Sequence, residues 1–164
     1  MRSEQLPSNY PPTLRFQGVR RGSALIEFAL VVTLALIPLV MGTIEFSILG
    51  KNSLTIANAT REGARAAAIG NTTTQIRARV TRFASPLSVT SPDGSIVLEY
   101  STDKGVSYQT LLDNSATTAN AAPTDSLVRV RVSSRNQSVT GALGVIFNRQ
   151  IPSAVTMRRE TNSG

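Results

Sequence analysis

The residue types that most often carry enzyme chemistry are missing from this chain. Its 164 residues include no Cys and no His. This excludes a zinc site of the usual kind, a Ser-His-Asp or Cys-His nucleophile and a thiol redox centre. The acids of the C-terminal half fall mainly in expected turns and loops, without the paired spacing of general acid–base catalysis: Asp93, Glu99, Asp103, Asp113 and Asp125. We therefore expect no enzyme activity, no catalytic residue, no metal, no cofactor and no small-molecule substrate.

A different chemistry is suggested near the N-terminus, where residues 21–28 read RGSALIEF. Gly22 stands between Arg21 and Ser23, at the basic end of the apolar run. An acid near the end of an apolar run is unfavourable in lipid, so Glu27 is either a functional group with a partner or an interfacial acid that reaches water.

The element that must position these residues is one long apolar helix. Residues 28–44 read FALVVTLALIPLVMGTI and carry no charge. At 1.5 Å per residue this run covers roughly 25 Å, and with its apolar flanks it exceeds the ~30 Å hydrocarbon core of a bilayer. We expect a transmembrane helix over residues 23–49. The alternative is a buried core helix of a soluble protein, although such a helix rarely lacks a polar stripe.

The flank before this helix is basic. Four arginines against the single acid Glu4 give residues 1–22 a net charge of +3. The arginines are Arg2, Arg15, Arg20 and Arg21. The positive-inside rule then keeps the N-terminus in the cytoplasm and exports the rest of the chain. The A-x-A-like site of a secretory signal peptide is not found after the apolar run, so we expect the helix to be retained.

The segment 21–28 resembles the processing motif of type IV prepilins, in which a basic leader and Gly22 precede Glu27 and Phe28 at the fifth and sixth positions after the cut. Two further motifs are GTIEF at residues 42–46 and ATREGARAA at residues 59–67. Together they are similar to the TadE-like family of pilin-like proteins, which belongs to the tight-adherence (Flp) type IVb pilus system. The resemblance covers roughly residues 20–69.

This resemblance implies a bacterial inner-membrane prepilin that a prepilin peptidase cuts after Gly22. It implies that the protein acts as a minor pilin or pseudopilin in pilus assembly, adhesion and biofilm formation. Whether the protein is incorporated into an extracellular pilus is left open. The implied partners are the peptidase, other pilin subunits, the inner-membrane assembly machinery and the lipid bilayer. Arg20 and Arg21 would serve leader recognition and topology. The family motif residues are Arg61, Glu62, Gly63, Ala64 and Arg65.

We assign Glu27, Phe28 and Glu45 to assembly and register. Cleavage would leave a new ammonium on Ser23 about four residues from Glu27, whose carboxylate could pair with a neighbouring subunit in a filament. Glu45 follows 18 residues after Glu27. At 100° per residue both acids project from one helix face, about 27 Å apart. Glu45 is either a second partner contact or an acid at the outer interface. Pro38 predicts a kink or a locally melted turn between the two acids.

Beyond the apolar run, no proline interrupts residues 39–69, and the helix is expected to continue to a stop at Gly70. Small residues at three-four spacing form one face: Ala57, Thr60, Ala64, Ala67 and Ala68. Such a face allows close packing, either against this protein's own sheet or against another subunit. Arg61 and Arg65 are expected to form a solvated or ion-paired edge around Glu62.

The remaining chain predicts a short second helix and a small sheet. Caps at residues 71–73 introduce a helix over residues 74–84, with Ile76, Val80 and Phe83 on one side. A period of two then predicts strands. They form a hairpin over residues 96–110 that turns at 103–105, a strand at 127–132 and a strand at 154–159. Residues 114–126 contain no large apolar side chain and predict a surface loop.

The predicted fold class is therefore α+β and membrane-anchored, with a long N-terminal transmembrane helix continuing into an exported domain that holds a second short helix and a small antiparallel sheet. The expected parts are a leader (1–22), a transmembrane helix (23–49), an exported helical region (50–85) and a β-rich domain (86–164). The net charge of +7 comes with dispersed arginines and only 5% aromatic residues, so we expect no nucleic-acid partner. The alternative function is a single-pass anchored binding or sensor domain without prepilin processing.

Overall fold

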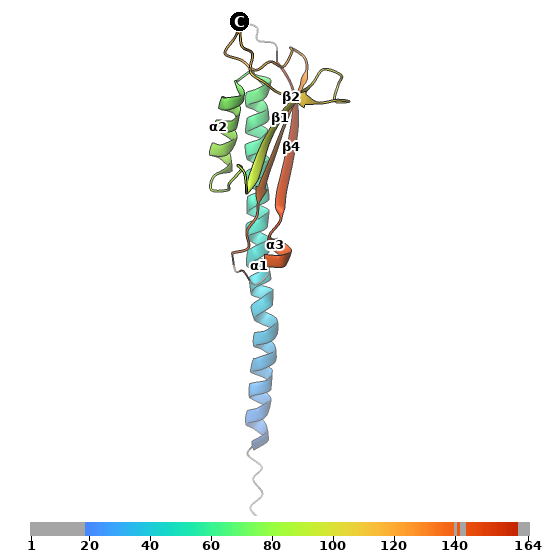
Figure 1. Cartoon of the computed structure of the whole chain (residues 1–164). Coiled ribbons are helices and arrows are strands. Elements are labelled where there is room, and N and C mark those ends of the chain that lie inside the picture. The colour runs from blue at the N-terminus through green and yellow to red at the C-terminus, as the bar shows by residue number, and fades with distance from the viewer. Residues whose placement is uncertain (1–18, 140, 142–143, 161–164) are drawn as a thin grey trace, which may run out of the picture. The chain divides into compact units, whose positions relative to one another are not determined.

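The structure of the protein, a computed structural model, describes residues 19–139, 141 and 144–160. The chain divides into two compact units, residues 1–40 and residues 41–164. The elements in chain order are α1 (Val19–Ala68), α2 (Thr73–Ala84), β1 (Gly94–Ser101), β2 (Gln109–Thr110), β3 (Leu127–Arg135), α3 (Gly144–Phe147) and β4 (Gln150–Arg158) (Figure 1). The predicted α+β class is confirmed: a long apolar helix, a short helix and a small antiparallel sheet.

The first unit consists, over its described residues, of the N-terminal part of α1. Its large apolar side chains are exposed around the helix, with Leu34 at 76%. Within the described ranges one helix is long and apolar enough to cross a membrane, over Gly22–Ala68, and its most apolar window has no residue buried inside the protein. This contradicts the alternative of a buried core helix and fits a membrane anchor. Of the kink or melted turn predicted at Pro38, the melted turn is not formed, because the helix runs through this residue without interruption.

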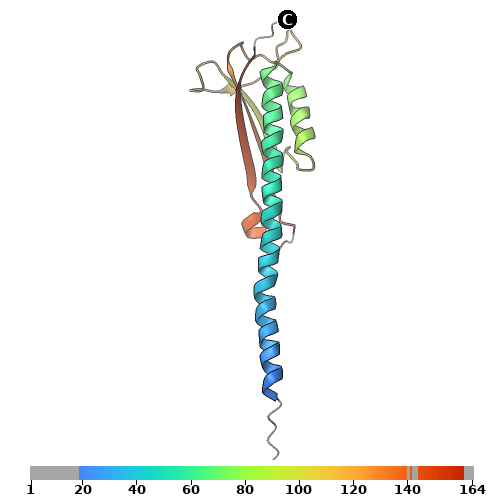
Figure 2. The same cartoon turned by 180° about the vertical axis from the view of Figure 1, so that it is seen from behind.

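The second unit has two layers. The strands form an antiparallel sheet in the order β2-β1-β3-β4, and α1 and α2 lie side by side over one face of it (Figures 1 and 2). Val130 of β3 is paired with Leu98 on one side and Val155 on the other. Because side chains alternate across a strand, every second residue of these strands faces the helices. Those that are buried there are Ile96, Leu98, Val128, Val130, Val132 and Ile151.

The small-residue face of α1 packs inside this unit. A Cβ added to Gly63 would lie 2.4 Å from Cγ2 of Val80 in α2 and 3.4 Å from Cγ1 of Val130 in β3. The neighbouring Ala59, Ala64, Ala66 and Ala67 have no exposed surface. The sequence left two packing partners open for this face, the protein's own sheet and another subunit. The structure shows the face packed against the protein's own sheet and against α2. Only Ala57 of the expected face is half-buried.

The turn between the two helices follows the expected capping signals. Gly70 has a φ of 95°, and the amides of Gly70 and Asn71 donate to the carbonyls of Ala67 and Ala66, each at 3.1 Å. This is the Schellman arrangement, which ends a helix with a left-handed glycine. Thr72 then caps α2 through a capping box with Gln75. The predicted stop at Gly70 and the predicted second helix are both confirmed.

Two details of the prediction are wrong. Phe83 is exposed, and the buried side of α2 consists of Ile76, Val80 and Ala84, because residues four apart share a helix face. The loop 114–126 is not wholly on the surface either. Asn120 is buried, and its amide donates to the carbonyl of Ala67 in the last turn of α1 (3.0 Å) and to the carbonyl of Asn71 just after this helix (2.9 Å).

The hairpin turn is organised by one carboxylate. Asp103 accepts hydrogen bonds from the Ser101 hydroxyl at 2.6 Å and from the Ser107 amide at 2.9 Å. These bonds, the Ser101 hydroxyl first, hold the pKa of Asp103 well below its usual range because they favour the ionised form. They also keep residues 101–107 in a compact turn, and the returning strand is limited to Gln109–Thr110. The turn is thus confirmed, with a shorter second strand than the alternation predicts.

Candidate processing and assembly segment

The predicted cleavage site lies in the first turn of α1. Gly22 and Ser23 are both exposed. A Cβ placed on Gly22 would meet no atom within 4 Å, and the backbone there is not left-handed. Neither a lack of space nor the backbone conformation therefore requires a glycine at this position. A glycine within a helix is unfavourable by about 1 kcal/mol relative to alanine. No contact within the described part of the chain accounts for the missing side chain at this position.

The backbone at this bond is helical and not extended. The helix begins at Val19, so Gly22 is among the first four residues, whose N–H groups have no acceptor within the helix. A turn of this kind unwinds more readily than the helix interior, and the glycine lowers the helix propensity further. Arg20 and Arg21 belong to the same turn, whereas leader residues 1–18 lie outside the described residues.

Ser23 and Glu27 share one face of the helix. They are four residues apart, a spacing that places their Cβ atoms about 5–6 Å from each other. A shallow hollow on this face is lined by Gly22, Ser23, Ile26, Glu27 and Leu30. Glu27 and Phe28 are exposed, so both side chains are accessible to another molecule. An ammonium created on Ser23 would lie within reach of the Glu27 carboxylate.

Glu45 has a different environment, because it is fully buried in the second unit. The hydroxyl of Ser138 donates a 2.6 Å hydrogen bond to its Oε1 atom. The sequence left two interpretations for this acid, a contact with a partner and an acid at the outer interface. The structure places the carboxylate against the segment that follows β3. Its part in assembly stays a prediction.

Sequence reasoning missed the residues that surround Glu45. The Asn52 amide of α1 donates to Oδ1 of Asn136 at 2.7 Å, and the Asn136 amide donates to the carbonyl of Phe147 at 2.9 Å. The backbone amide of Ser138 donates to Oδ1 of Asn148 at 2.8 Å. Together with the Ser138–Glu45 contact, these bonds hold residues 136–138 and 147–148 beside α1. Because the partners are 84 and 93 positions apart in the two contacts with α1, no local spacing pattern could have identified them.

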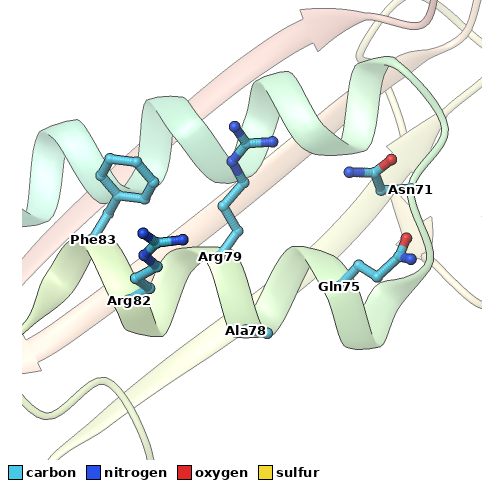
Figure 3. Close-up of a pocket in the computed structure, with 6 residues that line it drawn as sticks. All are labelled: Asn71, Gln75, Ala78, Arg79, Arg82 and Phe83. Carbon is cyan, nitrogen blue, oxygen red and sulfur yellow. The ribbon is translucent and has the colours of Figure 1, made fainter.

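The motif of residues 61–65 divides into packing and surface residues. Gly63 and Ala64 are buried, whereas Arg61 and Arg65 are exposed. The Glu62 carboxylate lies 3.5 Å from Nε of Arg79, a residue of α2. Figure 3 shows Arg79 reaching toward α1 from a groove that Asn71, Gln75, Ala78, Arg82 and Phe83 also line. The pair is partly exposed, so it contributes at most about 1 kcal/mol. Glu62 thus joins α1 to α2. Arg61 and Arg65, which were expected to form a solvated or ion-paired edge around Glu62, lie exposed beside it.

The acids of the folded unit do not assemble into a metal site over the residues that the structure describes, since no group of three or more His, Cys, Asp or Glu lies close enough to hold an ion. Glu99 of β1 is paired with Arg129 of β3 at 2.7 Å. Arg129 also stacks over the Tyr108 ring, 3.4 Å from its centroid. These contacts join neighbouring strands on the sheet face away from the helices. The position of the Glu99 acid is therefore explained by the structure of the sheet.

Comparison with known proteins identifies the segment just described. Residues 22–65 match the family model of TadE-like proteins. The match begins at the predicted cleavage glycine and ends at the last arginine of the 61–65 motif, so it confirms the resemblance inferred from these motifs. No curated protein and no solved structure matches the chain.

Proposed function

We propose that this chain, TadE-like over residues 22–65, is a membrane-anchored pilin-like component of a tight-adherence pilus system. In this proposal a prepilin peptidase cuts it after Gly22, and the product acts as a minor pilin or pseudopilin in pilus assembly. The family match carries the proposal, because it joins the Gly22 and Glu27 positions to an apolar helix that the protein itself leaves uncovered.

The proposed topology places the N-terminus in the cytoplasm of a bacterial inner membrane and the folded unit outside. The basic leader supports this orientation. The folded unit includes residues from Met41 onward. We infer that Ser23 to Val40, the first part of the helix expected over residues 23–49, lies in the lipid. About 18 residues before Met41 cover roughly 27 Å as a helix, which is close to the thickness of the hydrocarbon core.

Cleavage would change the charge at the inner edge of the membrane. It removes the basic leader and leaves an ammonium on Ser23, on the same helix face as Glu27. When an apolar helix moves from lipid to a bundle of other apolar helices, burial provides little driving force, since lipid tails are as apolar as leucine. Pairing between charged groups of neighbouring subunits then decides their register, and Glu27 is the acid in position to do so.

The decisive experiment measures the N-terminus of the protein made with and without its peptidase. We expect a chain that starts at Ser23 with the peptidase and a chain that starts at Met1 without it, by intact mass and N-terminal sequencing. Gly22→Leu should block the cut, because it adds a large side chain next to the bond that the peptidase must reach. Gly50→Leu is the matched control, since Gly50 is also helical and has no atom within 4 Å of an added Cβ.

An intact N-terminus in cells that process other prepilins would overturn the proposal. The chain would then be an anchored binding or sensor domain. Mechanical shearing of the cells separates the two pilin roles. A structural subunit copurifies with sheared filaments, whereas an assembly factor stays with the membrane.

A further inference from the structure

The segment between β3 and β4 presents large apolar side chains to its surroundings. Val139 is 69% exposed and Ile146, in α3, is 57% exposed. From α1 of the same unit, Phe46 adds an apolar side chain that is 71% exposed. Figures 1 and 2 both show α3 beside α1, at the end of the folded unit where α1 enters it. Apolar side chains gathered at one end of a domain indicate a surface that is covered by another phase or molecule.

Hydrogen bonds fix the position of this segment along α1. The Ser138 hydroxyl is bonded to Glu45, and Val139 is the next residue. At its other end, the Phe147 carbonyl accepts from Asn136, which is itself bonded to Asn52 of α1. The segment is therefore anchored at two points, Glu45 and Asn52, and Val139 lies at the level of Glu45.

That level lies just beyond the outer end of the proposed membrane span, four residues after Met41. Glu45 directly follows the charge-free residues 28–44. A carboxylate exposed to lipid on a membrane helix is unfavourable by about 2.5–3.5 kcal/mol at the bilayer centre, and by less toward the interface. The segment covers this carboxylate and supplies a hydrogen bond to it, while the side chains it exposes are apolar. This end of the folded unit thus presents exposed apolar side chains close to a covered acid.

We propose that residues 136–139 and 144–148 form an interfacial membrane-binding element, in which Val139 and Ile146 enter the boundary between headgroups and acyl chains beside α1. The occupant of the apolar surface is the bilayer that α1 crosses in the proposed function, because the segment is bonded to Glu45 and Glu45 directly follows the charge-free run in the sequence. The inference rests on the membrane anchoring in the proposed function.

A tryptophan introduced at one site reports its own environment, because the chain contains no tryptophan. Val139→Trp and Ile146→Trp are each made in the full chain and reconstituted in vesicles of phosphatidylcholine and phosphatidylglycerol. Lipids brominated near the headgroup end of the acyl chain then quench a tryptophan at the interface. Val106→Trp is the control, since Val106 is 87% exposed in the turn after β1. Leu36→Trp reports on the span itself.

We expect blue-shifted emission and severalfold stronger quenching by brominated lipid at positions 139 and 146 than at position 106. If Leu36→Trp is quenched while positions 139 and 146 behave like position 106, the interfacial element is wrong and the membrane anchor stands. If Leu36→Trp is not quenched, both fail. Protection from an aqueous quencher without lipid quenching would show a protein contact, such as another subunit, and would also overturn the proposal.

Tryptophan itself favours membrane interfaces, so a second probe removes this bias. The chain has no cysteine, which allows Ile146→Cys to carry a single spin label. We expect this label to be more accessible to oxygen in the lipid than to a water-soluble nickel complex. The opposite order would contradict the proposal, whatever the tryptophan variants show.

Discussion

The Ser138 hydroxyl and the Glu45 carboxylate meet at 2.6 Å although they are 93 positions apart in the sequence. This contact attaches the segment after β3 to the part of α1 that follows the apolar run. It gives a buried acid a hydrogen-bond donor at the place where the folded unit begins. A position that hydropathy assigns to the membrane span therefore belongs to the folded domain.

Loss of this contact should destabilise the folded unit. Ser138→Ala removes a hydrogen bond to a buried carboxylate, and such bonds contribute about 1.5–3 kcal/mol. We expect a lower midpoint of thermal unfolding in detergent and faster amide exchange over residues 136–139 and 144–148. The matched control is Ser47→Ala, which changes an exposed serine of the same helix. An unfolding midpoint equal to that of the wild type would show that the bond does not hold the segment.

Gly63 should tolerate no side chain. The Cβ of Gly63→Ala would lie 2.4 Å from Cγ2 of Val80, and the branched Val80 has little rotamer freedom in a helix. Overpacking of this kind is unfavourable by about 1–3 kcal/mol, measured as a change in the free energy of unfolding.

The second substitution Val80→Ala should restore part of that loss, which a double-mutant cycle measures as a coupling between the two sites. In contrast, Gly50→Ala should stabilise the helix, because the site is open and alanine has the higher helix propensity. Equal effects at the two glycines would argue against close packing at Gly63.

Glu27 is expected to act after processing. Glu27→Ala should still be cut to begin at Ser23, because the cleavage site is intact, but its incorporation into filaments should fall severalfold. The measurement is the ratio of processed protein in sheared filaments to processed protein in the membrane. Leu30→Ala, on the same helix face, controls for a shortened side chain. A variant at Glu27 that is cut and incorporated like the wild type would exclude the pairing role.

Asp103 should make the stability of the hairpin turn dependent on pH. Its pKa is lowered in the folded state by the Ser101 and Ser107 hydrogen bonds. The stabilisation is therefore complete above the unfolded pKa of about 3.9 and is lost as the pH falls toward the folded value. We expect Asp103→Asn to lower the unfolding midpoint at neutral pH and to lose this effect in strong acid.

The control for the Asp103 measurement is Asp125→Asn, which also removes one exposed negative charge. Asn tolerates the left-handed backbone at this position, where φ is 66°. If both variants respond to pH in the same way, the effect comes from net charge and not from the turn.

Features decided by near neighbours could be predicted from the sequence. The left-handed Gly70, the capping pair Thr72 and Gln75, and the alternation through Val128 to Val132 all depend on residues within a few positions. The uncovered apolar helix and the TadE-like motifs are likewise properties of continuous sequence. These signals were sufficient for the fold class, the family and the candidate cleavage site.

Tertiary structure decided which of these residues meet. Glu45 is buried only because Ser138 returns to it, Asn120 only because its loop closes over the end of α1, and Gly63 lies against Val80 and Val130. Hydropathy assigns each residue a preference for water or lipid but not a partner, and a partner far along the chain is chosen by the packing of the whole domain. For that reason hydropathy predicts a transmembrane helix over residues 23–49, a range that stays a prediction, and only the structure shows that residues from Met41 onward pack with the folded unit.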